Sequence, residues 1–88
     1  MSYDFPENEI LLEAFKKIMR VILPEAIKEL EFGRPYTLEE IIPEFMSALD
    51  VFERRISGRA VAILVREGLL PLEYDGKTSA NHCRYIRR

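Results

Sequence analysis

The sequence predicts a small α+β domain that is mainly α, with three to four helices followed by a two-stranded β-hairpin. Three observations predict this fold class. Residues 50–68 have the caps and the apolar period of one long helix. Thr37 and Glu40 have the spacing that opens another helix. After Gly68 apolar and polar residues alternate, which is typical of strands.

The length of 88 residues predicts a single domain over 1–88. It divides into an N-terminal helical segment (1–35), two helices joined by a turn (36–68), and a hairpin with a basic tail (69–88). No run reaches the ~18 apolar residues of a membrane helix. No basic start followed by an apolar segment marks a secretion signal. We therefore expect a cytoplasmic protein without a membrane partner.

The first helix is predicted from about residue 6 to residue 22, where apolar residues recur at steps of one, three and four. Asp4 and Glu7 have the spacing of a capping box at its start. Pro24 is expected either to kink this helix or to begin a new one. Gly33 is expected to end the whole element.

The first helix has more apolar positions than a core of this size needs. A homodimer contact through the N-terminal helix would use the surplus. The residues expected to form part of that contact are Ile10, Leu11, Ile18 and Ile22.

The second helix is predicted to begin at Leu38, after the extended step that Arg34-Pro35 imposes. Thr37 and Glu40 form its capping box. Pro43 removes a backbone hydrogen bond, so a bend or a short helix is expected. The residues expected to be buried are Leu38, Ile41, Ile42, Phe45 and Met46.

The third helix is predicted over 50–67, with Asp50 and Glu53 as a capping box and Gly68 as the left-handed cap. The alternative is a break at Ser57-Gly58, because glycine in a helix interior costs about 1 kcal/mol against alanine. The residues expected to be buried are Phe52, Ile56, Ala60, Ile63 and Leu64, with Val61 and Val65 on another side. The stripe left exposed carries Arg55, Arg59 and Arg66.

The hairpin is predicted from the alternation of Leu70, Leu72 and Tyr74 with polar residues. Asp75-Gly76 is expected to make the turn and 77–80 a polar loop. The return strand is expected over residues 81 to 87. On it Cys83 and Tyr85 share one face, and His82, Arg84 and Ile86 share the other.

Charge divides unevenly along the chain. Residues 1–50 carry a net charge of −6 and residues 51–88 a net charge of +4, within an overall charge of −2. Screening confines charge effects to about 8–10 Å in physiological salt. A polyanionic partner is therefore expected to meet the C-terminal half.

The order of elements resembles the winged helix-turn-helix family of transcription regulators. The resemblance lies in Tyr36-Thr37-Leu38-Glu39-Glu40-Ile41 and in Val61-x-x-Leu64-x-x-x-Gly68-Leu69-Leu70, which with the hairpin cover 36–87. In this chain Thr37 and Gly68 lie farther apart than in compact members. The resemblance implies a small, sequence-specific transcriptional regulator that binds double-stranded DNA. Helix 50–67 would lie in the major groove, with the 75–81 wing on the backbone or in the minor groove.

The planar guanidinium of arginine can bind a guanine edge or two phosphate oxygens. The basic residues of the winged-helix segment therefore suit DNA binding. Arg55 and Arg59 lie where base contacts occur, and Arg54 and Arg66 suit phosphates. Polar residues of the wing can donate hydrogen bonds to the backbone. The candidate DNA-binding residues are Arg54, Arg55, Arg59, Arg66, Lys77, Thr78, Ser79, Asn81, Arg84 and Arg87, with Arg88 in the same basic tail.

No enzyme, metal or cofactor is expected. His82 and Cys83 are adjacent, so on a strand they point to opposite faces. No second cysteine or histidine completes a zinc site. Cys83 is expected to be a small buried hydrophobe. The four glycines form no phosphate-binding cluster.

Two other partners stay open at this point. A winged helix can instead bind protein within a larger complex, since a fold does not fix function. The acidic first half favours that alternative. RNA binding would suit the same arginines, but it also needs exposed aromatic side chains for stacking. Tyr74 and Tyr85 lie in predicted strands and are expected to be packed.

Overall fold

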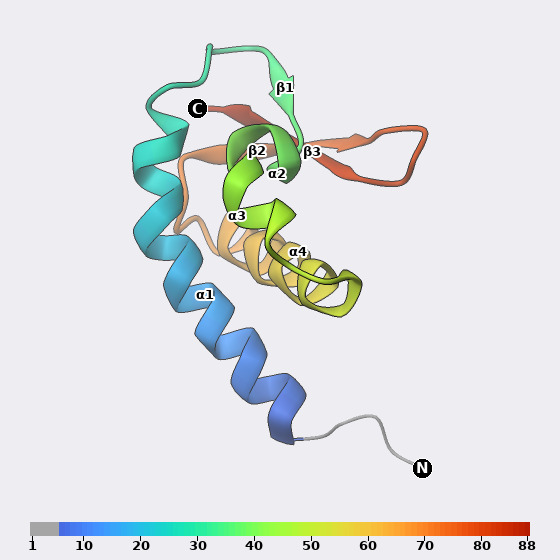
Figure 1. The fold of residues 1–88 in the computed structure, drawn as a ribbon. Helices are drawn as coiled ribbons and strands as arrows, with labels where there is room; N and C mark the ends of the chain where they lie inside the picture. Colours follow the sequence, from blue (N-terminus) through green and yellow to red (C-terminus); the bar gives the residue numbers. More distant parts are fainter. Residues whose placement is uncertain (1–5) are drawn as a thin grey trace.

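Four helices and a three-stranded antiparallel sheet make up the described part of the chain (Figure 1). The computed structural model describes the backbone of residues 6–88 and the side chains of residues 8–88. The predicted mainly helical α+β fold class is confirmed, and the arrangement is compatible with a winged-helix layout. The elements are α1 (Pro6–Ile27), β1 (Pro35–Tyr36), α2 (Leu38–Ile41), α3 (Pro43–Ser47), α4 (Val51–Arg66), β2 (Leu72–Lys77) and β3 (Cys83–Arg87).

Helix α1 continues through Pro24 to Ile27 as one helix, five residues beyond the predicted end. A proline lacks the N–H that would bond to the carbonyl four residues earlier, here that of Arg20. Arg20 is exposed, so water can hydrate that carbonyl. The predicted capping box at Asp4 lies outside the described residues. The side chains that α1 buries are those of Phe15, Met19, Leu23 and Ile27.

The segment between α1 and α2 makes a strand that the sequence did not predict. Gly33 has a φ of +80°, but the helix ends six residues before it. Beyond it Pro35 and Tyr36 pair with Ile86 and Tyr85 of β3. The extended backbone at Pro35 was expected, whereas its partner lies fifty residues away in the sequence.

The predicted second helix is split into α2 and α3 at Ile42, as Pro43 led us to expect. Ile42 has φ −131° and ψ 65°, which is not helical. At the start of α2 the backbone N–H of Thr37 donates to Glu40 Oε1 at 2.9 Å. The two short helices place Leu38 and Met46 in the core.

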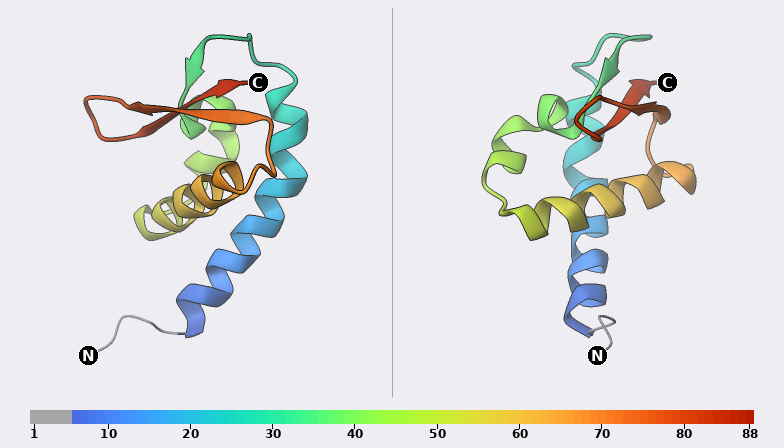
Figure 2. Two further views of the ribbon diagram at one scale, coloured as in Figure 1. Left: turned by 180° about the vertical axis from the view of Figure 1, so that it is seen from behind. Right: turned by 90° about the vertical axis from the view of Figure 1, so that its right-hand side faces the viewer.

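The sheet has the strand order β1-β3-β2. The predicted turn at Asp75-Gly76 is wrong, because both residues lie inside β2. The register shifts between Tyr74 and Lys77, and Gly76 takes a φ of +82° there. Glycine adopts this conformation without strain. The chain instead turns between Thr78 and His82, so the hairpin extends farther from the helices than predicted (Figure 2).

The core lies between α1, α4 and the inner face of the sheet, and α4 crosses α1 (Figure 2). Some predictions of burial are met only in part or are wrong. Four residues expected to be buried are only half-buried, namely Phe45, Ile63, Val65 and Cys83. Two aromatic side chains are exposed. Phe52 is 50% exposed because it lies in the first turn of α4, and Tyr74 is 51% exposed on β2. Tyr74 nevertheless makes an edge contact with the buried Tyr85, at 6.1 Å between ring centroids.

None of the helices between residues 6 and 88 combines the length and apolar character that crossing a bilayer needs. The same residues hold no cluster of three or more acidic, histidine or cysteine side chains suited to a metal ion.

Candidate nucleic-acid interface

Helix α4 is fixed at both ends, which positions every side chain along it. At its start the backbone N–H of Glu53 donates to Asp50 Oδ1 at 2.8 Å, and the backbone N–H of Asp50 donates to Glu53 Oε1 at 2.9 Å. At its end Gly68 takes a φ of +74°. The helix is continuous through Gly58, so the alternative break at Ser57-Gly58 is not found. The predicted helix 50–67 is confirmed to within a residue at each end.

Ser57 is buried within the continuous helix and its hydroxyl is hydrogen-bonded. Its hydroxyl donates to the backbone carbonyl of Arg54 at 2.9 Å, one turn earlier in α4. The same hydroxyl lies 3.8 Å from Met46 Sδ. A polar group in the core therefore has a hydrogen-bond partner, as burial requires.

The outer side of α4 carries three exposed arginines, Arg55, Arg59 and Arg66. Spacings of four and seven residues put them on one face of the helix. Among residues 8–88, their side chains make no ion pair and no hydrogen bond. This face, called the arginine stripe below, therefore has three cationic groups available to a partner.

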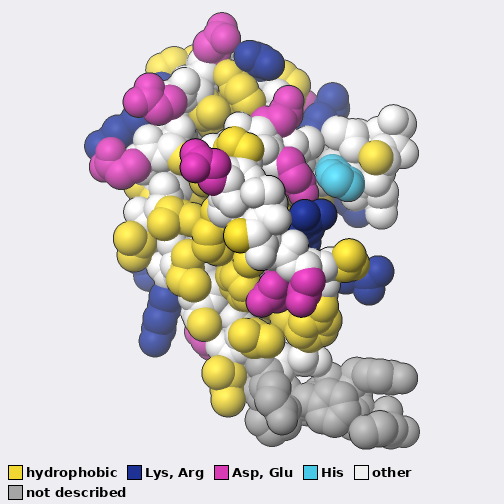
Figure 3. Space-filling view, in the orientation of Figure 1, with side chains coloured by type: hydrophobic (Ala, Val, Ile, Leu, Met, Phe, Trp, Pro, Cys, Tyr) yellow, Lys and Arg dark blue, Asp and Glu magenta, His cyan; other side chains and the backbone are white. Residues whose placement is uncertain are grey.

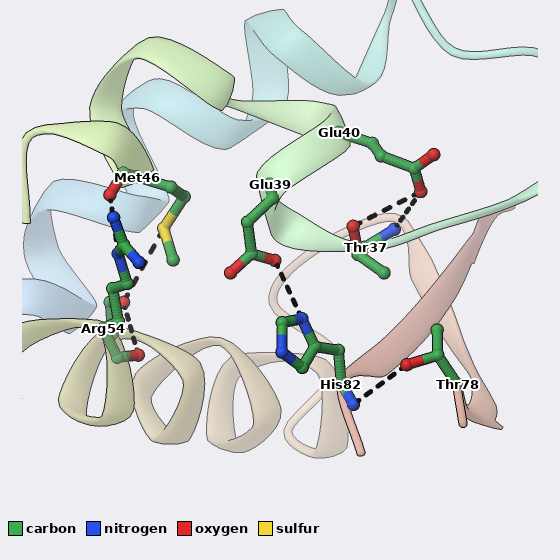
Figure 4. Close-up of polar contacts among 8 residues, drawn as sticks. Thr37, Glu39, Glu40, Met46, Arg54, Thr78 and His82 are labelled. Carbon is green, nitrogen blue, oxygen red and sulfur yellow. Dashed lines mark hydrogen bonds and ion pairs between the residues drawn. The ribbon is translucent and has the colours of Figure 1, made fainter. Parts of the chain in front are cut away.

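Arg54 lies beside the stripe but has a structural contact. Its Nε donates to the backbone carbonyl of Met46 at 3.1 Å (Figure 4). This bond ties the first turn of α4 to the end of α3. Arg54 is exposed and also lines a groove.

The groove has a volume of about 360 Å³ and lies between α4, the α2–α3 pair and the hairpin. Buried side chains of Leu38, Met46 and Tyr85 line its inner part. Glu39 Oε1 and His82 Nδ1 are 3.7 Å apart across it (Figure 4). The groove thus joins the start of α4 to the hairpin tip. Its remaining lining residues are Val51, Arg54, Arg55, Gly58, Asn81 and Cys83.

The hairpin tip is closed by its own backbone. The N–H of Thr78 donates to His82 O at 2.8 Å, and Thr78 Oγ1 accepts from the N–H of His82 at 3.2 Å. Asn81 has a φ of +68°, which asparagine tolerates better than most residues. Lys77, Ser79 and Asn81 are exposed, whereas the Thr78 hydroxyl already has a role in the turn.

The two candidate arginines on β3 differ from those on α4. Arg84 Nη2 donates to the Asp75 carbonyl at 3.1 Å and lies 3.5 Å from Asp75 Oδ2. Arg87 Nη1 donates to the carbonyls of Lys28 and Leu30, at 3.1 and 3.0 Å. Its guanidinium also lies 4.1 Å from the centroid of the Phe32 ring. Both side chains therefore hold elements of the fold together.

Tyr85 lies at the centre of the β3 inner face and is 1% exposed. Burial raises the pKa of its phenol well above the ordinary value, and the neighbouring Cys83 and Tyr74 add to that rise. Cys83 is half-buried beside it. The phenol is therefore neutral and belongs to the core of the sheet.

Sequence reasoning missed Glu39 and His82 as facing groups of the groove. They lie 43 residues apart in the sequence, and Glu39 entered the sequence analysis only as part of the segment that opens the second helix. The alternation of a β-strand predicts that His82 and Cys83 point to opposite faces. It does not predict which element His82 faces. Only the fold brings α2 and the hairpin tip together.

No family model, no curated protein and no solved structure matches this chain.

Proposed function

We propose that the chain is a winged helix-turn-helix protein that binds double-stranded DNA in a sequence-specific manner, as a small transcriptional regulator. Helix α4 would enter the major groove and the hairpin tip would contact the backbone. The observation that carries the proposal is the arginine stripe. Arg55, Arg59 and Arg66 are exposed on one helix face and have no protein partner among the described residues.

The geometry of DNA suits this face. A major groove about 12 Å wide admits an α-helix, and a bidentate arginine is the commonest specific contact to guanine. Arg55 lies in the first half of α4, where base contacts normally occur, and Arg59 lies one turn farther along, at the middle of the helix. Arg66, near the end of the helix, suits a phosphate. The stripe would therefore supply both sequence recognition and affinity.

The hairpin tip would supply backbone contacts. Lys77, Ser79 and Asn81 are exposed there and offer a cation and neutral donors. Such contacts set the register of a protein on the duplex without specifying the bases. The groove between the tip and α4 would then lie against the DNA backbone, with Arg54 and Asn81 at its edges.

The proposal is tested by fluorescence anisotropy with a labelled pool of mixed duplexes at about 50 and about 200 mM salt. We expect binding that weakens steeply between the two salt concentrations. Arg55→Ala/Arg59→Ala should reduce affinity for a selected preferred site at least about tenfold more than affinity for the pool. The matched control Arg20→Ala/Lys28→Ala removes the same charge from α1 and from the residue that follows it, and should change both affinities equally and slightly.

Lys77→Ala provides a second arm of this experiment. It should weaken binding to all duplexes about equally and reduce the salt slope by roughly one. No binding by the wild-type chain at tens of micromolar protein in about 50 mM salt would contradict the proposal.

An alternative function is a protein-interaction module, and one observation favours it. Val51 and Phe52 are exposed at the start of α4, next to the arginine stripe. Exposed apolar side chains beside arginines are typical of protein interfaces. Under this alternative, Phe52→Ser would abolish binding to an acidic protein partner. Under the DNA-binding proposal, the same change would leave duplex affinity within about twofold.

A further inference from the structure

Helix α1 has a second apolar side, turned away from the core. Ile10 is 66% exposed and Val21 is 74% exposed, and Ile18 is exposed beside them. Ala14 lies on the same side, one turn from Ile10 and one turn from Ile18. Figure 3 shows hydrophobic side chains on the surface of the lower part of the molecule, over α1. Leu11 and Ile22, which were expected here, instead pack partly against the core.

The spacing along this side is that of a helix–helix seam. Positions 10, 14, 17 and 21 follow one another at four, three and four residues, the repeat of the a and d positions in a coiled coil. The surface is hollowed over Ala14, and the walls of this hollow are Glu9, Ile10, Glu13, Ala14 and Lys17. Residues 10, 13, 14 and 17 are the four that surround a hole for a side chain of a facing helix.

The charged side chains around the hollow can pair with those of a second copy of the same helix. Lys17 is exposed and has no ion-pair partner within residues 8–88. Among the residues that the structure describes, Glu13 pairs only with Lys16 of its own helix, through a surface pair at 3.3 Å. An incoming lysine would therefore find a small apolar floor at Ala14 and carboxylates at the rim.

We propose that a second copy of this chain covers this side, with the two α1 helices antiparallel. Ile10 of each copy would pack against Val21 of the other. Lys17 of each copy would lie over Ala14 of the other, with its ammonium group at Glu13. A parallel pair would instead bring Lys17 against Lys17 in the seam, which like charges disfavour. The antiparallel pairing thus gives Lys17 of each copy a carboxylate partner by symmetry.

The shape of the molecule leaves room for this partner. The first half of α1 extends beyond α4 in all views (Figures 1 and 2). A second helix can therefore lie along this half of α1 without meeting α4. If the proposed function holds, such a dimer presents two α4 helices to two half-sites. The dimer itself does not depend on DNA binding.

Sedimentation velocity tests the interface on the full chain. We expect a dimer at tens of micromolar wild-type protein, and a monomer for Val21→Glu, which places a carboxylate in the apolar layer. The matched control Val51→Glu makes the same change at an exposed valine of α4, away from the proposed seam, and should remain dimeric. Because Val21 is exposed, Val21→Glu should keep the circular dichroism spectrum of a folded chain. A monomeric wild type at about 100 μM, or a dimeric Val21→Glu, would overturn the proposal.

Disulfide trapping tests the antiparallel register. In a Cys83→Ser background, Ile10→Cys and Val21→Cys chains are oxidised separately and as a mixture. The mixture should cross-link, because residues 10 and 21 face each other. Each chain alone should not, because equivalent residues are offset by eleven positions, or about 16 Å, beyond the reach of a disulfide. Cross-linking of each chain with itself would mean a parallel pair and would refute the register.

These outcomes separate the dimer from the proposed function. Loss of the dimer in Val21→Glu should leave binding to the mixed duplex pool measurable, because each copy keeps its own arginine stripe. A wild-type dimer that binds no duplex would retain this inference and reject the DNA-binding proposal.

Discussion

Arg59 on α4 and Arg87 on β3 belong to the same basic half of the chain, but their surroundings differ. Arg59 is exposed and its guanidinium has no partner in the described part of the chain. Arg87 donates to two carbonyls just beyond the end of α1 and covers the Phe32 ring. One guanidinium is available to a ligand, whereas the other is already bound within the fold.

The difference shows what decides whether a basic residue can serve as a binding group. Carbonyls beyond the end of α1 have no helical partner and need donors. The sheet carries β3 past that point, so Arg87 satisfies them. The arginines on the outer side of α4 reach no acceptor among the described residues, although Arg55 lines the groove beside α2 and the hairpin. Nonlocal packing, and not the basic sequence itself, makes the distinction.

The largest effect on stability is expected for Arg87→Ala. It should lower the free energy of unfolding by about 2 kcal/mol, because it removes charge-assisted hydrogen bonds and a cation–π contact. Arg59→Ala should change that free energy by less than about 0.5 kcal/mol. Urea unfolding followed by circular dichroism measures both. Equal losses of unfolding free energy in the two variants would contradict the claim that Arg87 stabilises the fold and Arg59 does not.

A smaller effect is expected for Arg84→Ala. Arg84 binds Asp75 within β2, and both side chains are partly exposed, so water weakens their attraction. Its Nε is buried without a hydrogen-bond partner in the described structure, and the cost of that burial offsets part of the stabilisation by the contacts with Asp75. We expect a loss of about 1 kcal/mol in urea unfolding, with Arg66→Ala as the control. A loss as small as that of Arg66→Ala would mean that Arg84 does not stabilise the fold and that its guanidinium is available to a partner.

The remaining effect is seen only at high pH and concerns the buried side of β3. Because the pKa of the Tyr85 phenol is raised in the folded chain, the unfolded chain ionises first, near pH 10. Below about pH 10 the raised pKa of Tyr85 therefore does not lower the free energy of unfolding. As the pH rises above 10, the free energy of unfolding falls by at most about 1.4 kcal/mol per pH unit on account of Tyr85. Tyr85→Phe should show a shallower fall in unfolding free energy between pH 9 and pH 11. Identical slopes in the two proteins would contradict this account.

Local signals predicted the helical part of the fold well. The capping residues Thr37, Asp50 and Gly68 fixed the start of α2 and both ends of α4, because a cap depends on neighbours within four residues. Pro43 likewise predicted the break at Ile42. These features depend on short-range sterics and hydrogen bonds, which the order of residues specifies directly.

Errors came where a distant partner decides the outcome. Asp75-Gly76 has the composition of a turn, but pairing with β3 continues past it and leaves a bulge. Strand β1 exists only because β3 lies beside it. For the candidate site, the three exposed arginines of α4 followed from helix periodicity. The engagement of Arg84 and Arg87 could not be predicted, because their acceptors belong to other elements.

The most direct test of this account compares the DNA affinities of Arg59→Ala and Arg87→Ala, at a temperature where both variants are folded. Each variant loses one positive charge from the same half of the chain. The account predicts that Arg59→Ala weakens binding to a preferred duplex by about tenfold or more, while Arg87→Ala weakens it less than about twofold. An equal loss for both, or a larger loss for Arg87→Ala, would contradict the assignment of the arginine stripe as the DNA-binding face.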